Sequence, residues 1–239
     1  MSMSPSVEDC LQPSRCIDSS HPAILTYAAS VTDSRNSAQE NAVALYYRVR
    51  DGIRYNPYAV ADSVDSFLAS TTLKAGEGWC VPKAILLAAL CRGVGIPARV
   101  GFADVRNHLS TERLRATMQT DIFYFHGYTS IYLNDRWVKA TPAFNVELCN
   151  KFQLRPLEFD GEEDSLYHPY DEAGNKHMEY VNDRGEYLDA PLEELLACFR
   201  EHYPNFFPNE TTQSSALPDR ADWEADIVRE AGLSRARGY

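Results

Sequence analysis

The first half of the chain carries apolar positions at helical spacing. Between residues 42 and 53, small, aliphatic and aromatic side chains recur every three or four positions, which predicts a helix that ends near residues 52–55. The stretch SAQE, from Ser37 to Glu40, is a capping box and marks where this helix begins. A second helix is predicted over residues 80–92, because an apolar run there continues until Gly93. A shorter helix is expected from Pro22 to about Ser30.

The second half of the chain favours strands. Strands are predicted over residues 98–105, 121–133 and 136–141, and Asn134-Asp135 supplies a tight turn between the last two. One more strand is expected within residues 178–187. Helices followed by a meandering antiparallel sheet are typical of the α+β class.

The remaining segments suggest how the chain is organised. Residues 1–20 are polar and rich in Ser and Pro, which predicts a loosely held N-terminal arm. A main domain is expected over residues 21–205, including a polar, aromatic and irregular stretch from 142 to 169 and a helix at 191–202. Residues 206–239 are then a flexible link followed by a helix at about 219–232.

Charge and composition exclude several classes of partner. The formal net charge of −11 argues against binding to nucleic acid or to an anionic membrane. The longest apolar run, from Ala84 to Leu90, is too short to cross a bilayer, and the N-terminus lacks a secretion signal. We therefore expect a cytoplasmic protein with reduced thiols. None of the six cysteines forms a CxxC pair, so neither a zinc site nor a redox pair is suggested.

Cys80 and His126 are the candidate catalytic pair. Cys80 stands at the predicted start of a helix, where unpaired N–H groups and the helix dipole favour a thiolate, and its pKa is expected to lie below about 8.5. His126 lies inside a strongly patterned strand, and Gly127 leaves room beside its ring. Taken singly, a cysteine at a helix start and a histidine in a strand are more often structural than reactive. The hypothesis depends on their combination.

Two stretches carry a resemblance to a known family. GEGWCVPKAILLAALCRGVGIPAR, from Gly76 to Arg99, and FHGYTSIYLNDRWVKATPAFN, from Phe125 to Asn145, resemble the core of the transglutaminase-like superfamily. The resemblance implies a papain-like α+β fold, with N-terminal helices packed on an antiparallel sheet and a Cys–His–Asp triad. It makes Cys80 the nucleophile and His126 the general base.

The resemblance also implies a reaction. The enzyme would transfer an acyl group through a thioester, without a cofactor, from a peptide, protein or small-molecule amide. Water as the acceptor gives a peptidase, amidase or deamidase, and an amine gives a transglutaminase or an amide-forming enzyme. The alternative is a catalytically inactive binding module. The oligomeric state stays open.

The third triad position departs from the family pattern. The family's aspartate would fall on Thr141 when counted forward from Trp137, and on Lys139 when counted back from the following ATP. A two-residue turn at 134–135 places Tyr128 opposite Thr141, so Thr141 lies diagonal to His126 on the same face of the sheet. Thr141 is therefore favoured over Lys139, whose charge would oppose an imidazolium. Asn145 and Asp160 are alternatives outside the motif.

Several further residues are candidates for binding. The backbone N–H of Cys80 is expected to contribute to an oxyanion hole, with Lys74 or Trp79 nearby and Trp79 more readily a wall of the cleft. Other residues expected beside the substrate are Gly127, Tyr128 and His108. The acidic run at 158–164 is either a solvated loop or a cover over the cleft that favours cationic or neutral substrates. The nine-residue spacing of His168 and His177 fits no compact metal site.

Overall fold

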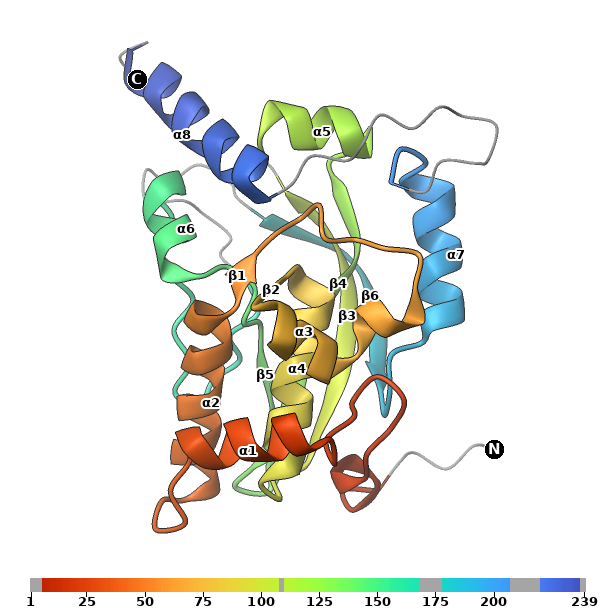
Figure 1. Ribbon diagram of the computed structural model, residues 1–239, viewed down its shortest axis with the longest axis vertical. Helices are drawn as coiled ribbons and strands as arrows, with labels where there is room; N and C mark the ends of the chain where they lie inside the picture. Colours follow the sequence, from red (N-terminus) through yellow and green to blue (C-terminus); the bar gives the residue numbers. More distant parts are fainter. Residues whose placement is uncertain (1–5, 108–109, 168–177, 207–219, 237–239) are drawn as a thin grey trace.

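A computed structural model describes residues 6–107, 110–167, 178–206 and 220–236 of the chain. A four-stranded antiparallel sheet in the order β5-β4-β3-β6 forms its centre (Figure 1). The strands are β3 (Ala98–Asn107), β4 (Ile122–Leu133), β5 (Arg136–Ala140) and β6 (Met178–Tyr187). The predicted α+β class, with N-terminal helices packed on an antiparallel sheet, is confirmed.

One helix, α4 (Cys80–Gly93), is buried along almost its whole length. It packs between the sheet and three other helices, α1 (Pro22–Val31), α2 (Ala38–Gly52) and α3 (Ala69–Ala75) (Figure 1). Its apolar side chains point in all directions, as expected for a helix surrounded by protein. On the sheet side, Thr129 Oγ1 of β4 donates a hydrogen bond of 2.8 Å to the carbonyl of Ala84. The helix is thereby fixed against β4.

Two buried basic side chains in α4 hold neighbouring segments. Lys83 Nζ donates to the carbonyls of Arg50 and Ile53, at 3.0 and 2.5 Å, and so satisfies groups at the end of α2. Arg92 donates to carbonyls in three separate segments, including that of Ala98 at 2.8 Å. Burial lowers the pKa of Lys83 to about 7. These contacts satisfy backbone groups that apolar side chains would leave unpaired.

The hairpin between β4 and β5 has the predicted register. Leu133 pairs with Arg136 and Thr129 pairs with Ala140. Asn134 and Asp135 both have positive φ, the conformation of a two-residue type I′ turn. Beyond Ala140, Thr141 donates its backbone N–H to Ser165, so residue 141 stays close to the sheet.

Three sequence predictions need correction. Within residues 6–20 the chain is not loosely held, because Cys10, Cys16 and Ile17 are fully buried and Asp189 accepts the N–H of Cys16. The stretch predicted to be irregular contains α6 (Val146–Phe152). Helix α5 (Glu112–Met118) and the short parallel pair β1 (Arg54–Tyr55) and β2 (Glu77–Gly78) were not predicted. The short 3-10 helices are Asp9–Leu11 and Val64–Phe67.

The C-terminal part adds α7 (Leu192–His202) and α8 (Arg220–Ala236), close to the predicted helices. Residues 207–219 of the predicted link lie outside the described residues. Within the described ranges, no helix has both the length and the apolar content required to span a membrane.

Candidate active site

Cys80 occupies the first position of α4. Trp79 precedes it as the N-terminal cap residue and provides no side-chain hydrogen bond. Pro82 has no N–H, and the N–H of Lys83 bonds to the Trp79 carbonyl. The first turn of the helix therefore has two N–H donors without a carbonyl partner inside the helix, those of Cys80 and Val81. Both face the Cys80 sulfur, together with the N–H of Gly127 from β4.

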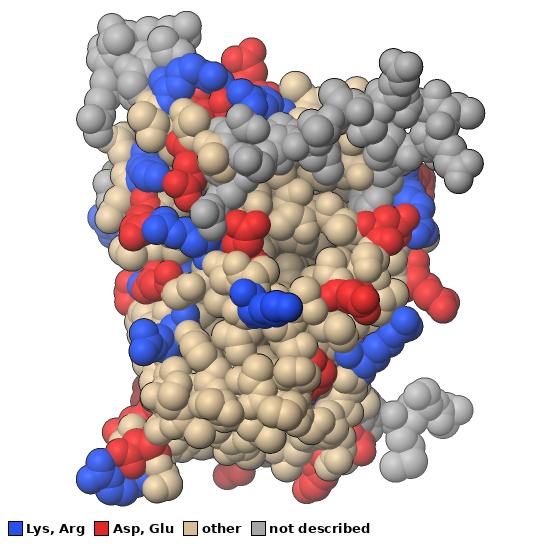
Figure 2. Space-filling view, in the orientation of Figure 1, with Lys and Arg blue, Asp and Glu red and all other residues tan. Residues whose placement is uncertain are grey.

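The thiol itself lies in an apolar pocket. Cys80 is 3% exposed, and the pocket volume is about 40 Å³. The walls are mostly aromatic or aliphatic and consist of Tyr55, Pro57, Val60, Trp79, Leu114, Met118, Phe123, Tyr124, Phe199, Tyr203 and Phe206. Figure 2 shows a hollow near the centre of the face in view, and the residues around it are mostly uncharged.

The prediction that the pKa of Cys80 is lowered was wrong. Burial raises its pKa to about 11, and the N–H groups of Gly127, Val81 and Cys80 offset only part of this effect. The expected N-terminal donors are present, but the aromatic walls remove the water that would solvate a thiolate. Cys80 is therefore a neutral thiol at neutral pH in this conformation.

His126 is also buried and uncharged. It is 5% exposed, and burial lowers its pKa to about 4. Its Nδ1 atom has no hydrogen-bond partner among the residues that the structure describes. The ring lines a small cavity of about 10 Å³, together with Thr141 and mostly apolar side chains that include Ala143, Phe144 and Met178. A cavity of this size accommodates about one water molecule.

Gly127 is the point of contact between the first turn of α4 and the strand that carries His126. A Cβ atom at Gly127 would lie 2.9 Å from Val81 Cα and 3.3 Å from the Cys80 carbonyl oxygen. The first turn of α4 is therefore in direct contact with β4 at the residue that follows His126. The two side chains nevertheless line different cavities. Within the described part of the chain, no hydrogen bond joins Cys80 Sγ to the imidazole.

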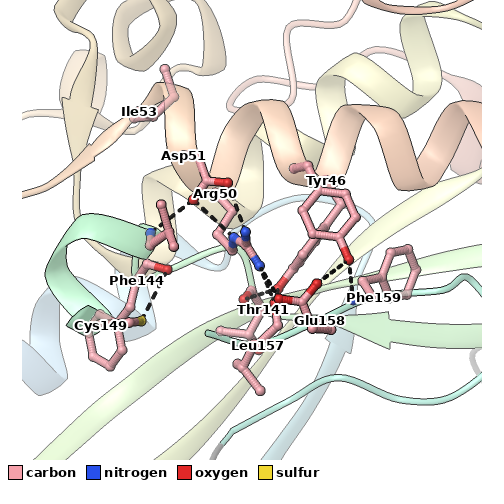
Figure 3. Close-up of polar contacts among 12 residues, drawn as sticks. Tyr46, Arg50, Asp51, Ile53, Thr141, Phe144, Cys149, Leu157, Glu158 and Phe159 are labelled. Carbon is pink, nitrogen blue, oxygen red and sulfur yellow. Dashed lines mark hydrogen bonds and ion pairs between the residues drawn. The ribbon is translucent and has the colours of Figure 1, made fainter. Parts of the chain in front are cut away.

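Thr141 lies where the strand register placed it, beside His126. It is 2% exposed and lines the same small cavity. Its carbonyl accepts a hydrogen bond of 3.3 Å from Tyr46 Oη, and Figure 3 shows this contact at the edge of a polar cluster from α2. Thr141 Oγ1, like His126 Nδ1, has no partner in the described ranges. Two buried polar atoms thus share one cavity without a direct hydrogen bond between them.

The alternatives for the third position lie elsewhere. Lys139 Nζ lies 5.1 Å from the centre of the Tyr128 ring and 3.4 Å from a Glu186 carboxylate oxygen. Asn145 accepts the N–H of Tyr55 at 3.3 Å. Asp160 is exposed and accepts backbone N–H groups from its own turn. None of the three lines the cavity beside His126.

The acidic run at 158–164 does not line either cavity. Glu158 accepts a hydrogen bond of 2.6 Å from Tyr47 and pairs with Arg50, both in α2 (Figure 3). Asp164 accepts the backbone N–H of Lys139 in β5. The charges therefore bind this segment to α2 and β5, while the apolar Leu157 at its edge lines the cavity beside His126.

Of the predicted binding residues, Trp79 and Gly127 lie beside Cys80, whereas Lys74 and Tyr128 do not line its pocket. Trp79 is a wall of the Cys80 pocket and packs against the rings of Phe67 and Phe199. Gly127 forms the contact with α4. Lys74 is exposed at the end of α3 and does not line the pocket. Tyr128 covers Gly101, where a Cβ atom would lie 2.1 Å from its ring.

The remaining candidates are not described or do not form a site. His108, His168 and His177 lie outside the described residues. Among the residues that are described, no group of His, Cys, Asp and Glu is suited to hold a metal ion.

The C-terminal wall of the Cys80 pocket was not predicted. Phe199 lies in α7, Tyr203 is the residue directly after this helix, and Phe206 follows. Tyr203 Oη accepts the N–H of Tyr124 at 2.6 Å and donates to the Ile122 carbonyl at 3.0 Å, so it is bound to the beginning of β4. The spacing of apolar residues in α7 indicated that one face of this helix is buried, but it did not indicate that this face covers the Cys80 pocket.

Comparison with known proteins agrees with this architecture. Residues 25–142 match the transglutaminase-like superfamily, and the match includes Cys80, His126 and Thr141. No functionally curated protein matches the chain. The chain thus contains a transglutaminase-like superfamily domain.

Two solved structures are similar at a low level. One is named "Putative Cysteine Protease" from Cytophaga hutchinsonii, with 16% identity, a TM-score of 0.46, and coverage of 77% of this chain and 55% of that one. The other is named "Putative Protease" from Parabacteroides distasonis, with 17% identity, a TM-score of 0.37, and coverage of 57% and 26%. This chain therefore spans about half and a quarter of their lengths. At these values neither structure bears on its activity.

Proposed function

We propose that this protein is a cysteine-dependent acyl-transfer enzyme that acts on an amide or related acyl bond through a thioester on Cys80. One observation carries the proposal. In a transglutaminase-like domain, the thiol at the start of the buried helix α4 faces three backbone N–H groups, two from the first turn of α4 and one from Gly127, the strand residue after His126. A nucleophile beside unpaired N–H donors and a histidine is the arrangement that acyl transfer requires.

The reaction follows from these groups. In the reaction, the imidazole of His126, which lines a separate cavity in this structure, must reach the Cys80 sulfur and accept its proton as the sulfur attacks the carbonyl carbon. The N–H groups of Cys80 and Gly127 stabilise the negative charge that develops on the carbonyl oxygen. The C–N bond then breaks, and His126 returns the proton to the leaving amine, so that a thioester remains on Cys80. Water or an amine, deprotonated by His126, attacks the thioester and restores the thiol.

The pKa values of Cys80 and His126 favour a proton transfer that accompanies the attack, because they do not allow a thiolate–imidazolium pair to form beforehand. A thiol pKa of about 11 and an imidazole pKa of about 4 leave both groups neutral at pH 7. The imidazole is then in the form that accepts a proton. Thr141 lies where the family pattern has a carboxylate, in the same cavity as the ring, and a hydrogen bond formed between its hydroxyl and the imidazole during the reaction would orient the ring without adding a charge.

The pocket around the thiol supports an apolar acyl donor. Aromatic and aliphatic side chains surround Cys80, and the acidic residues at 158–164 lie outside this pocket. Binding of an apolar acyl group would remove apolar surface from water on both partners. The acceptor decides between hydrolysis and transfer to an amine.

A second candidate function is binding without catalysis. It is favoured by two observations, that residue 141 is not a carboxylate and that no hydrogen bond joins Cys80 to His126 in the described ranges. A binding module would use the same apolar pocket, and Cys80 would not react.

The experiment that separates these functions is intact-mass spectrometry with p-nitrophenyl butyrate, an activated apolar acyl donor. An acyl enzyme adds one butyryl group to the wild-type protein, hydroxylamine removes it, and the Cys80→Ala variant gains none. Release of butyrate identifies water as the acceptor, and an added primary amine that yields its N-butyryl amide identifies transfer. A protein that gains no butyryl group, or gains it equally in Cys80→Ala, contradicts the proposal.

A further inference from the structure

The strand that carries His126 is irregular immediately before this residue. In β3 and β4, Ala103 pairs with His126, and a regular ladder would then pair Val105 with Tyr124. Val105 instead pairs with Phe123, so Tyr124 and Phe125 together lie opposite Asp104. Phe125 has a φ of +53°, which is uncommon for any residue other than glycine. These features define a β-bulge, and bulges often redirect a side chain next to an active site.

The carboxylate of Asp104 holds this bulge. Asp104 is 4% exposed, and its Oδ1 accepts the backbone N–H of Phe125 at 3.1 Å. The same oxygen accepts from Arg184 Nε at 2.6 Å, and Oδ2 accepts from Asn182 Nδ2 at 3.3 Å. The N–H that the bulge removes from the strand ladder is therefore satisfied by a buried charge, as burial requires.

Arg184 extends this arrangement to two further elements. Its guanidinium lies 4.2 Å from the centre of the Phe125 ring, so it contacts the bulge from its side-chain face. It also lies 3.8 Å from Glu194 and 3.7 Å from the Cys198 sulfur, both in α7, the helix that lines the Cys80 pocket. The bulge is thus fixed on one side by a carboxylate and on the other by a cation–π contact.

The bulge fixes the backbone directly before the imidazole. Because of the extra residue, Phe123 and His126 face the same side of the sheet although they are three positions apart. On that side lies the cavity shared with Thr141, and the next residue, Gly127, contacts α4. From His126 onward the ladder with β3 is regular, so without the bulge Phe123 would change faces and the backbone at Phe125, directly before the ring, would no longer be held.

We propose that Asp104 is a positioning residue for His126, which acts by holding the Phe125 bulge with the help of Arg184. This inference rests on the proposed function for its catalytic meaning, since the positioned group is the proposed general base. Asp104 does not touch the reacting atoms. Asp104 lies outside both stretches that resemble the family, residues 76–99 and 125–145.

The test compares Asp104→Ala and the milder Asp104→Asn with a matched control, Asp183→Ala. Asp183 is an exposed aspartate of β6 that accepts the N–H of Gly185, another positive-φ residue, at 2.8 Å. The first measurement is an NMR titration of His126, which requires no activity. The titratable side chains that share its cavity, Cys149 and Tyr167, are unchanged in all variants.

In Asp104→Ala we expect the His126 titration to move up by more than one pH unit toward 6.5, because a released ring gains access to water. Asp104→Asn, whose amide oxygen still accepts from Phe125, shows a smaller shift, and Asp183→Ala shows none. The second measurement is the rate of Cys80 butyrylation, which we expect to fall at least tenfold in Asp104→Ala. An unchanged His126 titration in Asp104→Ala and Asp104→Asn overturns the inference. A wild-type protein that is never butyrylated overturns the proposed function, while the titration still tests the position of the ring.

Discussion

Gly127 and Val81 lie so close together that no larger residue fits between the strand and the helix. A Cβ atom on Gly127 would be 2.9 Å from Val81 Cα, and the neighbouring atom is backbone, which does not move aside as a flexible side chain does. This contact places the first turn of α4, with Cys80, against the strand residue after His126. The proposed catalytic pair thus depends on a glycine.

Gly127→Ala is therefore expected to separate α4 from β4. Overpacking of this kind costs about 1–3 kcal/mol of the free energy of unfolding. The rate of Cys80 butyrylation should fall by a larger factor than this loss of stability explains, because the added methyl group displaces Cys80 directly. Gly52→Ala is the matched control, since a Cβ there meets only Tyr27 Oη at an ordinary 3.5 Å. Urea denaturation and butyrylation of both variants are measured together, and equal behaviour of the two would show that the contact tolerates a methyl group.

Replacing Thr141 tests the third position. Thr141→Val should slow butyrylation about tenfold to a hundredfold, which corresponds to the loss of an orienting hydrogen bond of about 1.4–2.7 kcal/mol in the transition state. Thr129→Val, a buried threonine of β4 that faces α4 instead, should affect stability more than rate. If Thr141→Val reacts as fast as the wild type, the hydroxyl has no orienting role.

Thr141→Asp should raise the pKa of His126, because a carboxylate in the same cavity stabilises the imidazolium. The family pattern has a carboxylate at this position, so we expect the variant to remain active. An NMR titration of His126 in this variant gives the direction of the shift. A pKa that stays at about 4 or falls would show that residue 141 does not interact with the ring.

Acid should destabilise the protein through His126. Its pKa is about 4 in the folded state against 6.5 when unperturbed, so the unfolded chain binds the proton more readily. The contribution of neutral His126 to the free energy of unfolding is complete above pH 6.5. It is lost as the pH falls from 6.5 to 4, by up to about 3 kcal/mol. Urea denaturation from pH 8 to pH 4 should show this slope in the wild type and a shallower one in His126→Gln. His21→Gln, which removes an exposed histidine, should keep the wild-type slope.

The order of thiol modification should follow burial. Cys198 is the only partly exposed thiol, and the other five, including Cys80, are buried. Iodoacetamide at pH 7 should therefore label Cys198 before Cys80, whose pKa of about 11 leaves little thiolate. Peptide mapping after partial labelling gives the order, and unfolded protein labelled at all six positions is the reference. Labelling of Cys80 first would restore the low pKa expected from its helix position alone.

The sequence was most informative where local rules dominate. The capping box at Ser37, the apolar run of α4 and the Asn134-Asp135 turn each determine their own geometry, and the turn also set the register that places Thr141 near His126. The helices α5 and α6 were missed because segments of seven residues depend on tertiary packing more than on their own propensity.

What the sequence did not indicate depends on contacts between distant segments. The pKa of Cys80 is raised by a pocket that α7 closes, about 120 positions later in the chain. The bulge at Phe125 occurs without a glycine, because Asp104 and Arg184 from two other strands hold it. Neither effect leaves a local signal around Cys80 or His126.

The most direct test of the account is the rate at which Cys80 is butyrylated in the wild type and in His126→Ala. General-base catalysis contributes about 10²–10⁴-fold, so at pH 7 the single-turnover rate should fall by at least a hundredfold in His126→Ala while Cys80→Ala remains unmodified. Circular dichroism confirms that each variant is folded. A His126→Ala protein that is butyrylated within twofold of the wild-type rate would contradict the account, because Cys80 would then react without the histidine.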